Sequence, residues 1–318
     1  MTEARRLRLA DLIPLLLVLA VAAGARVGYL ITYAGDAGNP GPMIVQDAPP
    51  ELALPLGGRL NEVEALAQNI KEYRWFGTLA PFAPREEQTA HVAPGYPWLL
   101  GELERILPSE LGPFDRFLRW AQCVLGVLTA GLYYLIAREA FPGRLVAFLT
   151  GLLCALHPFW VVSTAAVNDG VLATFMLGAA LWLGVRAQRF DGALTALLFG
   201  LTLAGLTLVR AALLPFAVIA VLGLLHRSRR LASGWQYGLL TVLGFVLGLA
   251  PWFVRNAQVF GDIYPIVDST YLHLWAGNNP RATGGPLSEQ ALFDALPEET
   301  RNHMRAPTLS QAGRYRLL

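Results

Sequence analysis

The residues of this sequence that could do chemistry stand mostly at the ends of long apolar runs. Asp169, in the segment STAAVNDGVLATF, comes where one such run begins. An ionisable side chain at the edge of an apolar segment is energetically costly and needs a reason. We therefore expect Asp169 either to face a cavity as a general base or ligand, or to cap the helix that follows it. The local sequence favours neither.

Two arginines have similar positions. Arg210 interrupts an apolar stretch in LTLVRAALLPF, and Arg255 ends another, with Asn256, in APWFVRNAQVFGD. The guanidinium fork of Arg210 is suited to a lipid phosphate, and the alternative is an arginine that reaches out to the headgroups. Read locally, Arg255 and Asn256 are better explained as an interfacial anchor beside Trp252.

Other candidates lie in segments that are less apolar. Glu62 and Glu64 belong to LNEVEALAQNIKEYR, where each alone reads as a solvated charge on a helix. His91 could transfer protons near neutral pH, although a histidine is more often structural. The segment WAGNNP, residues 275–280, adds further polar groups. The cysteines, Cys123 and Cys154, sit in apolar runs and are predicted to pack in the core.

The elements that position these residues are predicted to be membrane helices. The chain is 54% hydrophobic and 15% charged, whereas soluble domains carry roughly 25% charged residues. Helices are the expected form, because lipid offers no partner to an open backbone. We expect an all-α, polytopic integral membrane protein with about seven transmembrane helices. The predicted spans are 10–33, 116–137, 144–164, 170–186, 192–209, 211–226 and 236–254.

Arginines in the short loops predict the orientation. With seven spans, four sets of arginines fall on the same side of the membrane, which is then cytoplasmic. The sets are Arg5, Arg6 and Arg8, then Arg138 and Arg144, then Arg186 and Arg189, and finally Arg227, Arg229 and Arg230. The N-terminal run is too long for a signal peptide. The N-terminus is thus predicted to be cytoplasmic, in a multi-pass protein of the cytoplasmic (inner) membrane.

The opposite, extracytoplasmic face then holds the long loop 34–115, the turns at 165–169 and at Arg210, and the C-terminal segment. Within the loop, residues 60–74 and 97–108 have the apolar spacing of amphipathic surface helices. We expect residues 1–258 to form a transmembrane bundle that includes this loop, and 259–318 an extracytoplasmic segment. Acids and arginines meeting on one face suit a substrate with a charged phosphate, a lipid tail and a polar part outside.

The segment APWFVRNAQVFGDIYPIVDSTYLHLWAGNNPRATGG resembles a signature of bacterial membrane glycosyltransferases of the GT-C type. The chain is similar to glycosyltransferase family 39, the protein O-mannosyltransferases and the lipid A aminoarabinose transferase. LAQNI at 66–70, TAHVAPGYPWLLG at 89–101, NDGVLATF at 168–175 and LTLVRAALLPF at 207–216 resemble further family segments, in order along nearly the whole chain.

The resemblance implies an enzyme that takes a sugar from a polyprenyl-phosphate donor and passes it, with inversion, to an acceptor glycan, lipid or protein. It implies a carboxylate general base and arginines, here Arg210 and Arg255, that hold the phosphate. Substrate-binding residues would be His91, Tyr96, Asn256, Trp275 and Asn278. No tightly bound cofactor and no nucleic acid partner is expected. No metal-ligand cluster is recognisable in the sequence, and the sequence does not settle a divalent-metal requirement.

The sequence departs from the family pattern at two places. An Asp followed by a Tyr is usual ahead of the Leu-Ala pair, but Val63 stands at the Tyr place and Arg59 near the Asp place, so Glu62 is the nearest acid. The catalytic base is therefore open among Glu62, Glu64 and Asp169. Family members also usually continue beyond the position of Leu318, which suggests a chain lacking the C-terminal part and inactive alone.

Two other classes of protein fit the spans. A lipid or solute transporter, or flippase, would also carry arginines inside the membrane, but it should show broken helices in paired halves, and no internal repeat is visible. A loop of about 80 residues built from surface helices is also long for a connector. The remaining alternative is a non-catalytic fragment or scaffold.

Overall fold

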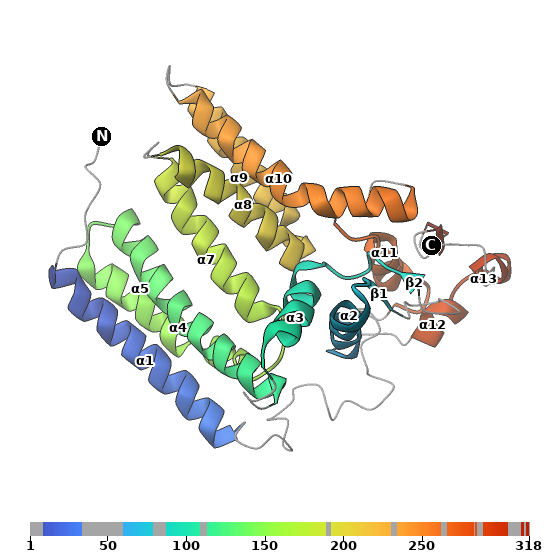
Figure 1. Ribbon diagram of the computed structural model, residues 1–318, viewed down its shortest axis with the longest axis horizontal. Coiled ribbons are helices and arrows are strands. Elements are labelled where there is room, and N and C mark those ends of the chain that lie inside the picture. The colour runs from blue at the N-terminus through green and yellow to red at the C-terminus, as the bar shows by residue number, and fades with distance from the viewer. Residues whose placement is uncertain are drawn as a thin grey trace. The chain divides into compact units, whose positions relative to one another are not determined.

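The computed structural model is almost entirely helical (Figure 1). It describes residues 9–33, 60–78, 87–108, 113–188, 192–229, 234–261, 266–282, 284, 289–304, 313–314 and 316–317. The chain divides into two compact units, Met1–Pro42 with Pro108–Leu249 (unit 1) and Met43–Leu107 with Ala250–Leu318 (unit 2).

Unit 1 contains the helices whose composition suits a membrane. They are α1 (Leu9–Tyr33), α4 (Phe114–Ala140), α5 (Arg144–Leu156), α6 (Pro158–Ser163), α7 (Gly170–Ala187), α8 (Ala193–Val209), the 3-10 turn η3 (Ala211–Leu213), α9 (Leu214–Arg229) and the first part of α10 (Trp235–Phe260). Five segments are long and apolar enough to cross a bilayer: Asp11–Thr32, Phe114–Ala140, Gly170–Ala187, Ala211–Ser228 and Trp235–Phe260. The prediction of a polytopic helical membrane protein is confirmed, with five of the seven spans found at full length.

The other two predicted spans are shorter apolar helices. Helix α8 has 17 residues, and the span predicted over 144–164 is divided into α5, with 13 residues, and α6, with six. The prediction of one continuous helix there is wrong because of Pro158. Proline lacks the N–H that a helix needs and disfavours helical backbone angles in the residue before it. His157 accordingly has ψ 115° and ends α5.

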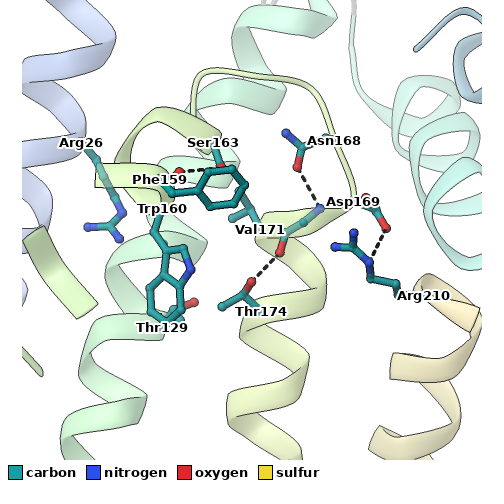
Figure 2. Close-up of a pocket in the computed structure, with 12 residues that line it drawn as sticks. Arg26, Thr129, Phe159, Trp160, Ser163, Asn168, Asp169, Val171, Thr174 and Arg210 are labelled. Atoms are coloured by element: carbon teal, nitrogen blue, oxygen red, sulfur yellow. Dashed lines mark hydrogen bonds and ion pairs between the residues drawn. The ribbon is translucent and has the colours of Figure 1, made fainter. Parts of the chain in front are cut away.

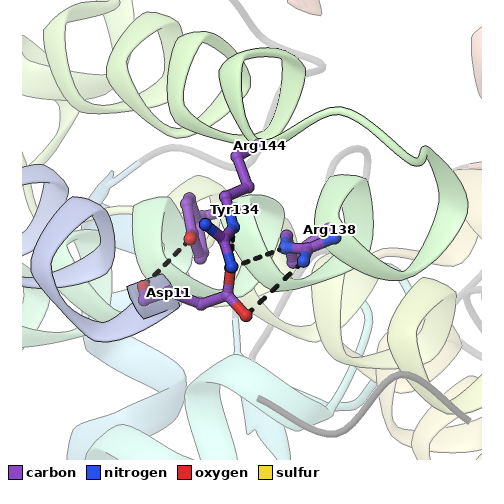
Figure 3. A network of polar contacts seen from close by, with 4 residues as sticks. All are labelled: Asp11, Tyr134, Arg138 and Arg144. Atoms are coloured by element: carbon purple, nitrogen blue, oxygen red, sulfur yellow. Dashed lines mark hydrogen bonds and ion pairs between the residues drawn. The ribbon is translucent and has the colours of Figure 1, made fainter. Parts of the chain in front are cut away.

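A buried ion cluster ties together one end of α1, α4 and α5, which lie side by side (Figures 1 and 3). The Asp11 carboxylate, 1% exposed, accepts hydrogen bonds from Nε of Arg138 and from Nε of Arg144, each at 3.0 Å. The Tyr134 hydroxyl donates to the Asp11 carbonyl at 3.0 Å. The loop arginines that served as orientation signals thus also hold the bundle together.

Small residues let α8 and α10 approach closely. Gly200 faces the backbone of α10, where an added Cβ would collide with the Thr241 carbonyl oxygen and lie 2.8 Å from the Phe245 nitrogen. The Thr241 hydroxyl crosses to the Ala196 carbonyl at 3.0 Å. Close backbone contact at small residues is a common way of packing helices in lipid, where the hydrophobic effect does not draw them together.

Unit 2 holds the two predicted amphipathic helices, found as α2 (Leu60–Tyr73) and α3 (Gly95–Ile106). Their apolar faces pack on each other: a Cβ on Gly101 would lie 2.7 Å from the Ala67 carbonyl oxygen and 2.9 Å from Ile70 Cβ. Lys71 and Glu104 pair across the two helices at 2.9 Å. The amphipathic pattern is therefore used, at least in part, for packing within the protein.

The rest of unit 2 is a small hairpin and short helices. Strands β1 (Gly77–Thr78) and β2 (Glu87–Gln88) pair antiparallel, a feature that the sequence reading did not predict. The later helices are α11 (Thr270–Asn278), α12 (Glu289–Asp294) and α13 (Glu298–Met304). Arg314, 1% exposed, pairs with Glu87 at 2.6 Å and so joins the C-terminal segment to the hairpin.

Asp11→Asn is expected to destabilise the protein by about 3 kcal/mol, because breaking a buried pair leaves the Arg138 charge without its carboxylate. Unfolding of the protein in detergent micelles would measure it. The control is Asp115→Asn, at an exposed site in the first turn of α4, where a loss below about 1 kcal/mol is expected. Equal losses in the two variants would contradict the importance of the Asp11 cluster.

Gly200→Ala is expected to cost about 1–3 kcal/mol, because the new methyl group meets backbone atoms that cannot rotate away. Gly223→Ala is the matched control, since a Cβ at Gly223 on α9 meets nothing within 4 Å. That change should be neutral or stabilising by up to about 1 kcal/mol through helix propensity. The same detergent unfolding measurement compares them, and a harmless Gly200→Ala would refute the close α8–α10 contact.

Candidate functional site

A cavity of about 280 Å³ opens within unit 1 among α1, α4, α6, α7 and the end of α8 (Figure 2). Its lining combines one carboxylate, two arginines, several hydroxyl and amide groups and two aromatic rings. The lining residues are Arg26, Gly126, Thr129, Phe159, Trp160, Ser163, Asn168, Asp169, Gly170, Val171, Thr174 and Arg210. Of the predicted site residues, Asp169 and Arg210 meet here.

Asp169 stands at the N-cap position of α7, but its side chain does not cap the helix. Asn168 caps the helix instead, because its Oδ1 accepts a hydrogen bond from the Gly170 N–H at 2.8 Å. The Asp169 carboxylate points to Arg210, with 4.0 Å between Oδ2 and Nε (Figure 2). Of the two readings that the sequence left open for Asp169, the structure supports the one in which it faces a cavity.

Burial raises the pKa of Asp169 above that of an ordinary aspartate. The charge of Arg210 and the backbone N–H of Asp169 act in the opposite direction but do not cancel the effect of burial. A carboxylate with a raised pKa is a stronger base, and a general base works best when its pKa approaches the working pH. The environment of Asp169 therefore suits proton removal from a hydroxyl group.

Arg210 ends α8, and its carbonyl accepts the Leu213 N–H as the chain turns into η3. Its side chain is 53% exposed. It is therefore held near Asp169 by its backbone, while much of the guanidinium group stays accessible. Such a cation can contact both the carboxylate and an anionic ligand in the cavity.

Arg26 lines the same cavity and was not identified from the sequence. It lies in the middle of α1, is fully buried, and donates from Nη1 to the carbonyls of Ala22 at 3.2 Å and Ala155 at 2.9 Å. Its Nη2 donates to the Cys154 carbonyl at 3.4 Å. The only signal in the sequence was a charged residue within the apolar run 10–33, and this alone should have marked it as a functional candidate.

Gly126 makes room for Arg26. A Cβ at this position of α4 would collide with Arg26 Nε and lie 3.0 Å from Cδ. The neighbouring hydroxyls are satisfied within their own helices: Thr129 donates to Leu125 and Thr174 to Gly170. These oxygens therefore present acceptor lone pairs, and not donors, to a ligand.

Arg255 lies in unit 2, and its guanidinium group is occupied by the hairpin. Nη1 donates to the carbonyl of Thr89 at 2.8 Å, and Nη2 to that of Phe76 at 2.9 Å. Its guanidinium carbon also lies 4.8 Å from the Trp252 ring centroid. Arg255 therefore joins the two ends of the hairpin to α10. Its predicted contact with a phosphate stays a prediction.

Other predicted site residues also lie in unit 2. His91 is buried, with its carbonyl bonded to Ser269 Oγ at 3.0 Å and its ring 6.3 Å from that of His273. Tyr96 is buried in α3, and Asn256 is fully buried with its Oδ1 accepting from Arg255. These contacts hold His91 and Asn256 in place, and substrate binding by the three residues stays a prediction.

The WAGNNP segment ends α11. Trp275 Nε1 donates to the Leu292 carbonyl at 3.3 Å, and Asn278 is exposed with its amide bonded to Leu274. Asn279, which belongs to the predicted polar segment but not to the predicted substrate-binding residues, is buried. It donates to the carbonyls of Trp275 and Ala276 and accepts the Arg281 N–H at 2.8 Å. This asparagine shapes the turn that closes the helix.

Of the acids predicted on α2, Glu64 is exposed. Glu62 belongs to the helix, but its side chain lies outside the described residues. Among the residues that the structure describes, no three His, Cys, Asp or Glu side chains come together as a metal site would require.

Comparison with protein families decides the class of the protein. A family model described as dolichyl-phosphate-mannose-protein mannosyltransferase matches residues 91–254, just over half of the chain. The chain belongs to this family. It is therefore a member of a family of membrane glycosyltransferases that use a lipid-phosphate-linked sugar donor, and the predicted resemblance is confirmed. Searches of curated proteins and of solved structures gave no significant match.

The matched region contains every residue that lines the cavity except Arg26. It therefore includes both members of the Asp169–Arg210 pair. Glu62, Glu64 and Arg255 lie outside the matched region.

Arg210→Gln is expected to raise the pKa of Asp169 further, because it removes the positive charge that favours the ionised carboxylate. The measurement is a pH titration of the infrared band of the protonated carboxyl, assigned by its loss in Asp169→Asn. Arg186→Gln is the control, since Arg186 pairs with Glu139 and does not line the cavity. A midpoint that Arg210→Gln leaves unchanged or lowers would disprove the electrostatic pairing.

Proposed function

We propose that this protein moves a sugar from a polyprenyl-phosphate donor to an acceptor hydroxyl or amine, on the extracytoplasmic side of the inner membrane, with inversion at the anomeric carbon. The observation that carries the proposal is the cavity in which Asp169, Arg210 and Arg26 meet. A carboxylate and a cation at the ends of apolar helices, with a second cation inside α1, suit a donor with a lipid tail and a charged phosphate. The family supports the same reaction class.

In the proposed reaction the acceptor attacks the anomeric carbon from the side opposite the phosphate. The new bond joins the acceptor oxygen or nitrogen to that carbon, and the bond between carbon and phosphate oxygen breaks. Its electron pair leaves with the lipid phosphate, which gains one negative charge. The acceptor proton passes to the base. No redox partner is required.

Asp169 is our choice for the base. It lies in the cavity, and its raised pKa suits proton transfer. Glu62 and Glu64 remain the alternatives that the sequence suggested, and the experiment below compares all three.

Arg210 is our choice for the residue that stabilises the departing phosphate. The leaving group gains charge as the bond breaks, so a cation placed nearby stabilises the transition state more than the bound donor. Arg210 is half-exposed and lies beside Asp169, and both residues line the same cavity, which supports these two roles. Arg255 would need to exchange its hairpin contacts to do the same.

A flippase for the lipid-linked sugar is the second candidate. The break between α5 and α6 favours it, because discontinuous membrane helices are common at transporter sites. A flippase would give a different result from a transferase in proteoliposomes. The labelled lipid would cross the bilayer with the bond between sugar and phosphate intact.

The deciding experiment is transfer of labelled sugar from a polyprenyl-phosphate donor in proteoliposomes. Asp169→Asn is expected to lower the rate about 10²–10⁴-fold through loss of the base, and Arg210→Gln about 10²–10³-fold through loss of charge stabilisation. Glu62→Gln and Glu64→Gln should retain activity, as should the exposed control Asp115→Asn. Loss of activity in Glu62→Gln or Glu64→Gln, with Asp169→Asn active, would move the base to α2. A folded wild type that transfers no sugar would refute the proposed function.

A further inference from the structure

The segment between α5 and α7 carries Asp169 to the cavity, and it has little regular helix of its own. It contains the six residues of α6 and the turn 164–169. Backbone carbonyls that are buried in such a segment need hydrogen-bond donors from elsewhere in the protein. Two side chains from other helices supply them, one at each end of the segment.

Arg26 holds the first end of this segment. Pro158 has no N–H, so the Cys154 carbonyl lacks its helical partner, and the end of α5 leaves the Ala155 carbonyl without one. Arg26 donates to these two carbonyls, at 3.4 and 2.9 Å. The point at which the chain leaves α5 is therefore fixed to α1.

Gln122 holds the second end from α4. Its amide Nε2 donates to the carbonyls of Thr164 at 3.2 Å and Ala166 at 2.8 Å. An amide NH2 group has two hydrogens, so both donors of Gln122 are used by this turn. The side chain is 3% exposed, and its Oε1 has no hydrogen-bond partner among the described residues. The contacts that the buried amide makes in the described part of the chain are therefore those of a donor to the turn.

Asn168 links the same turn to the first residue of α7. Its Nδ2 donates to the Ala166 carbonyl at 3.3 Å, so this carbonyl receives hydrogen bonds from both Gln122 and Asn168. Its Oδ1 accepts the Gly170 N–H at 2.8 Å (Figure 2). A continuous set of contacts therefore runs from α4 through the turn to the start of α7, and Asp169 lies inside it.

The backbone angles of Asp169 explain why its side chain is left for the cavity. An N-cap residue typically has extended angles, and its side chain then accepts N–H groups of the first helical turn. Asp169 instead has φ −69° and ψ −16°, which are helical values, and its side chain makes no capping bond. A turn held in this form keeps the carboxylate at the cavity, 4.0 Å from Arg210.

We propose that Gln122 is a positioning residue for Asp169. Together with Asn168 it holds the turn 164–169 in the form that leaves the Asp169 carboxylate in the cavity and prevents it from capping α7. The inference rests on the proposed function and deepens it by naming a residue that acts through the base. Gln122 does not line the cavity, so its effect on the reaction is indirect.

Titration of Asp169 in the whole protein tests the proposal without needing turnover. Gln122→Met keeps the length of the side chain and removes the donor. The released carboxylate should then accept helix N–H groups, which favour its ionised form and lower the pKa of Asp169. The midpoint of the protonated-carboxyl infrared band, assigned by its loss in Asp169→Asn, should therefore fall below the wild-type midpoint. The charged groups that share the cavity with Asp169, Arg26 and Arg210, are the same in both proteins.

Further variants show whether the effect passes through the turn. Gln188→Met, at the exposed C-cap of α7, is the matched control and should leave the midpoint unchanged. Asn168→Ala should lower the midpoint, because the Gly170 N–H loses its cap, whereas Asn168→Ser keeps a capping oxygen and should restore the midpoint. Because Gln122 and Asn168 act on one turn, the shift in the double variant should be smaller than the sum of the two single shifts.

An unchanged or raised midpoint in Gln122→Met, or additive shifts in the double variant, would overturn the proposal. If Gln122→Met does not fold, Gln122→Asn gives the deciding measurement. It shortens the reach of the donor by one methylene group and should also lower the midpoint, and an unchanged midpoint there would overturn the proposal equally.

Transfer kinetics separate this proposal from the proposed function. Gln122→Met should lower kcat about 10–10²-fold with a smaller change in KM, because misplacing a reacting group by about 1 Å costs up to about 10²-fold. The acid limb of the rate profile should move to lower pH together with the infrared midpoint, which a simple loss of stability would not cause. A wild type that transfers no sugar would overturn the proposed function and leave the infrared test of positioning intact. A Gln122→Met protein with wild-type kcat and midpoint would overturn the positioning role alone.

Discussion

The requirement that every buried backbone group find a hydrogen-bond partner governs the cavity region. In lipid no water can complete an interrupted helix, and each unsatisfied carbonyl costs several kcal/mol. Pro158 deprives the Cys154 carbonyl of its helical partner, and the end of α5 leaves the Ala155 carbonyl without one. Arg26 donates to both carbonyls from another helix. The buried guanidinium group and the open carbonyls of α5 provide hydrogen-bond partners for each other. A cation is also favoured at a helix C-terminus. The result is a helix break that opens space beside α7.

Five arginines of unit 1 fall into two groups by partner. Arg138, Arg144 and Arg186 pair with carboxylates, at Asp11 and Glu139, and stabilise helix ends. Arg26 is bonded to carbonyls, and Arg210 sits at the edge of ion-pair distance from Asp169. Each arginine of the first group contacts a carboxylate, and none of the three lines the cavity. The second group leaves positive charge at the cavity, where an anionic donor can compensate it.

The arginines Arg255 and Arg314 of unit 2 have structural contacts with the hairpin, unlike the two arginines that line the cavity. Arg255 and Arg314 are fixed by the hairpin, one through backbone carbonyls and aromatic rings and the other through Glu87. These contacts join the C-terminal segment and α10 to the loop between α2 and α3. The sequence motif around Arg255, which carries much of the family resemblance, thus has a structural reason for its composition.

The sequence by itself determined the membrane class, the approximate helix positions and the family, because apolar runs and local motifs are properties of neighbouring residues. It also marked Asp169 and Arg210, since charges at the ends of apolar runs stand out without any structure. Only the tertiary structure decided that Asn168, and not Asp169, caps α7, and that Arg26 belongs to the same cavity. The carbonyls that Arg26 satisfies are about 130 residues away in the chain. A hydrogen bond over that separation exists only once α1 and α5 have packed, so no local pattern could have revealed it.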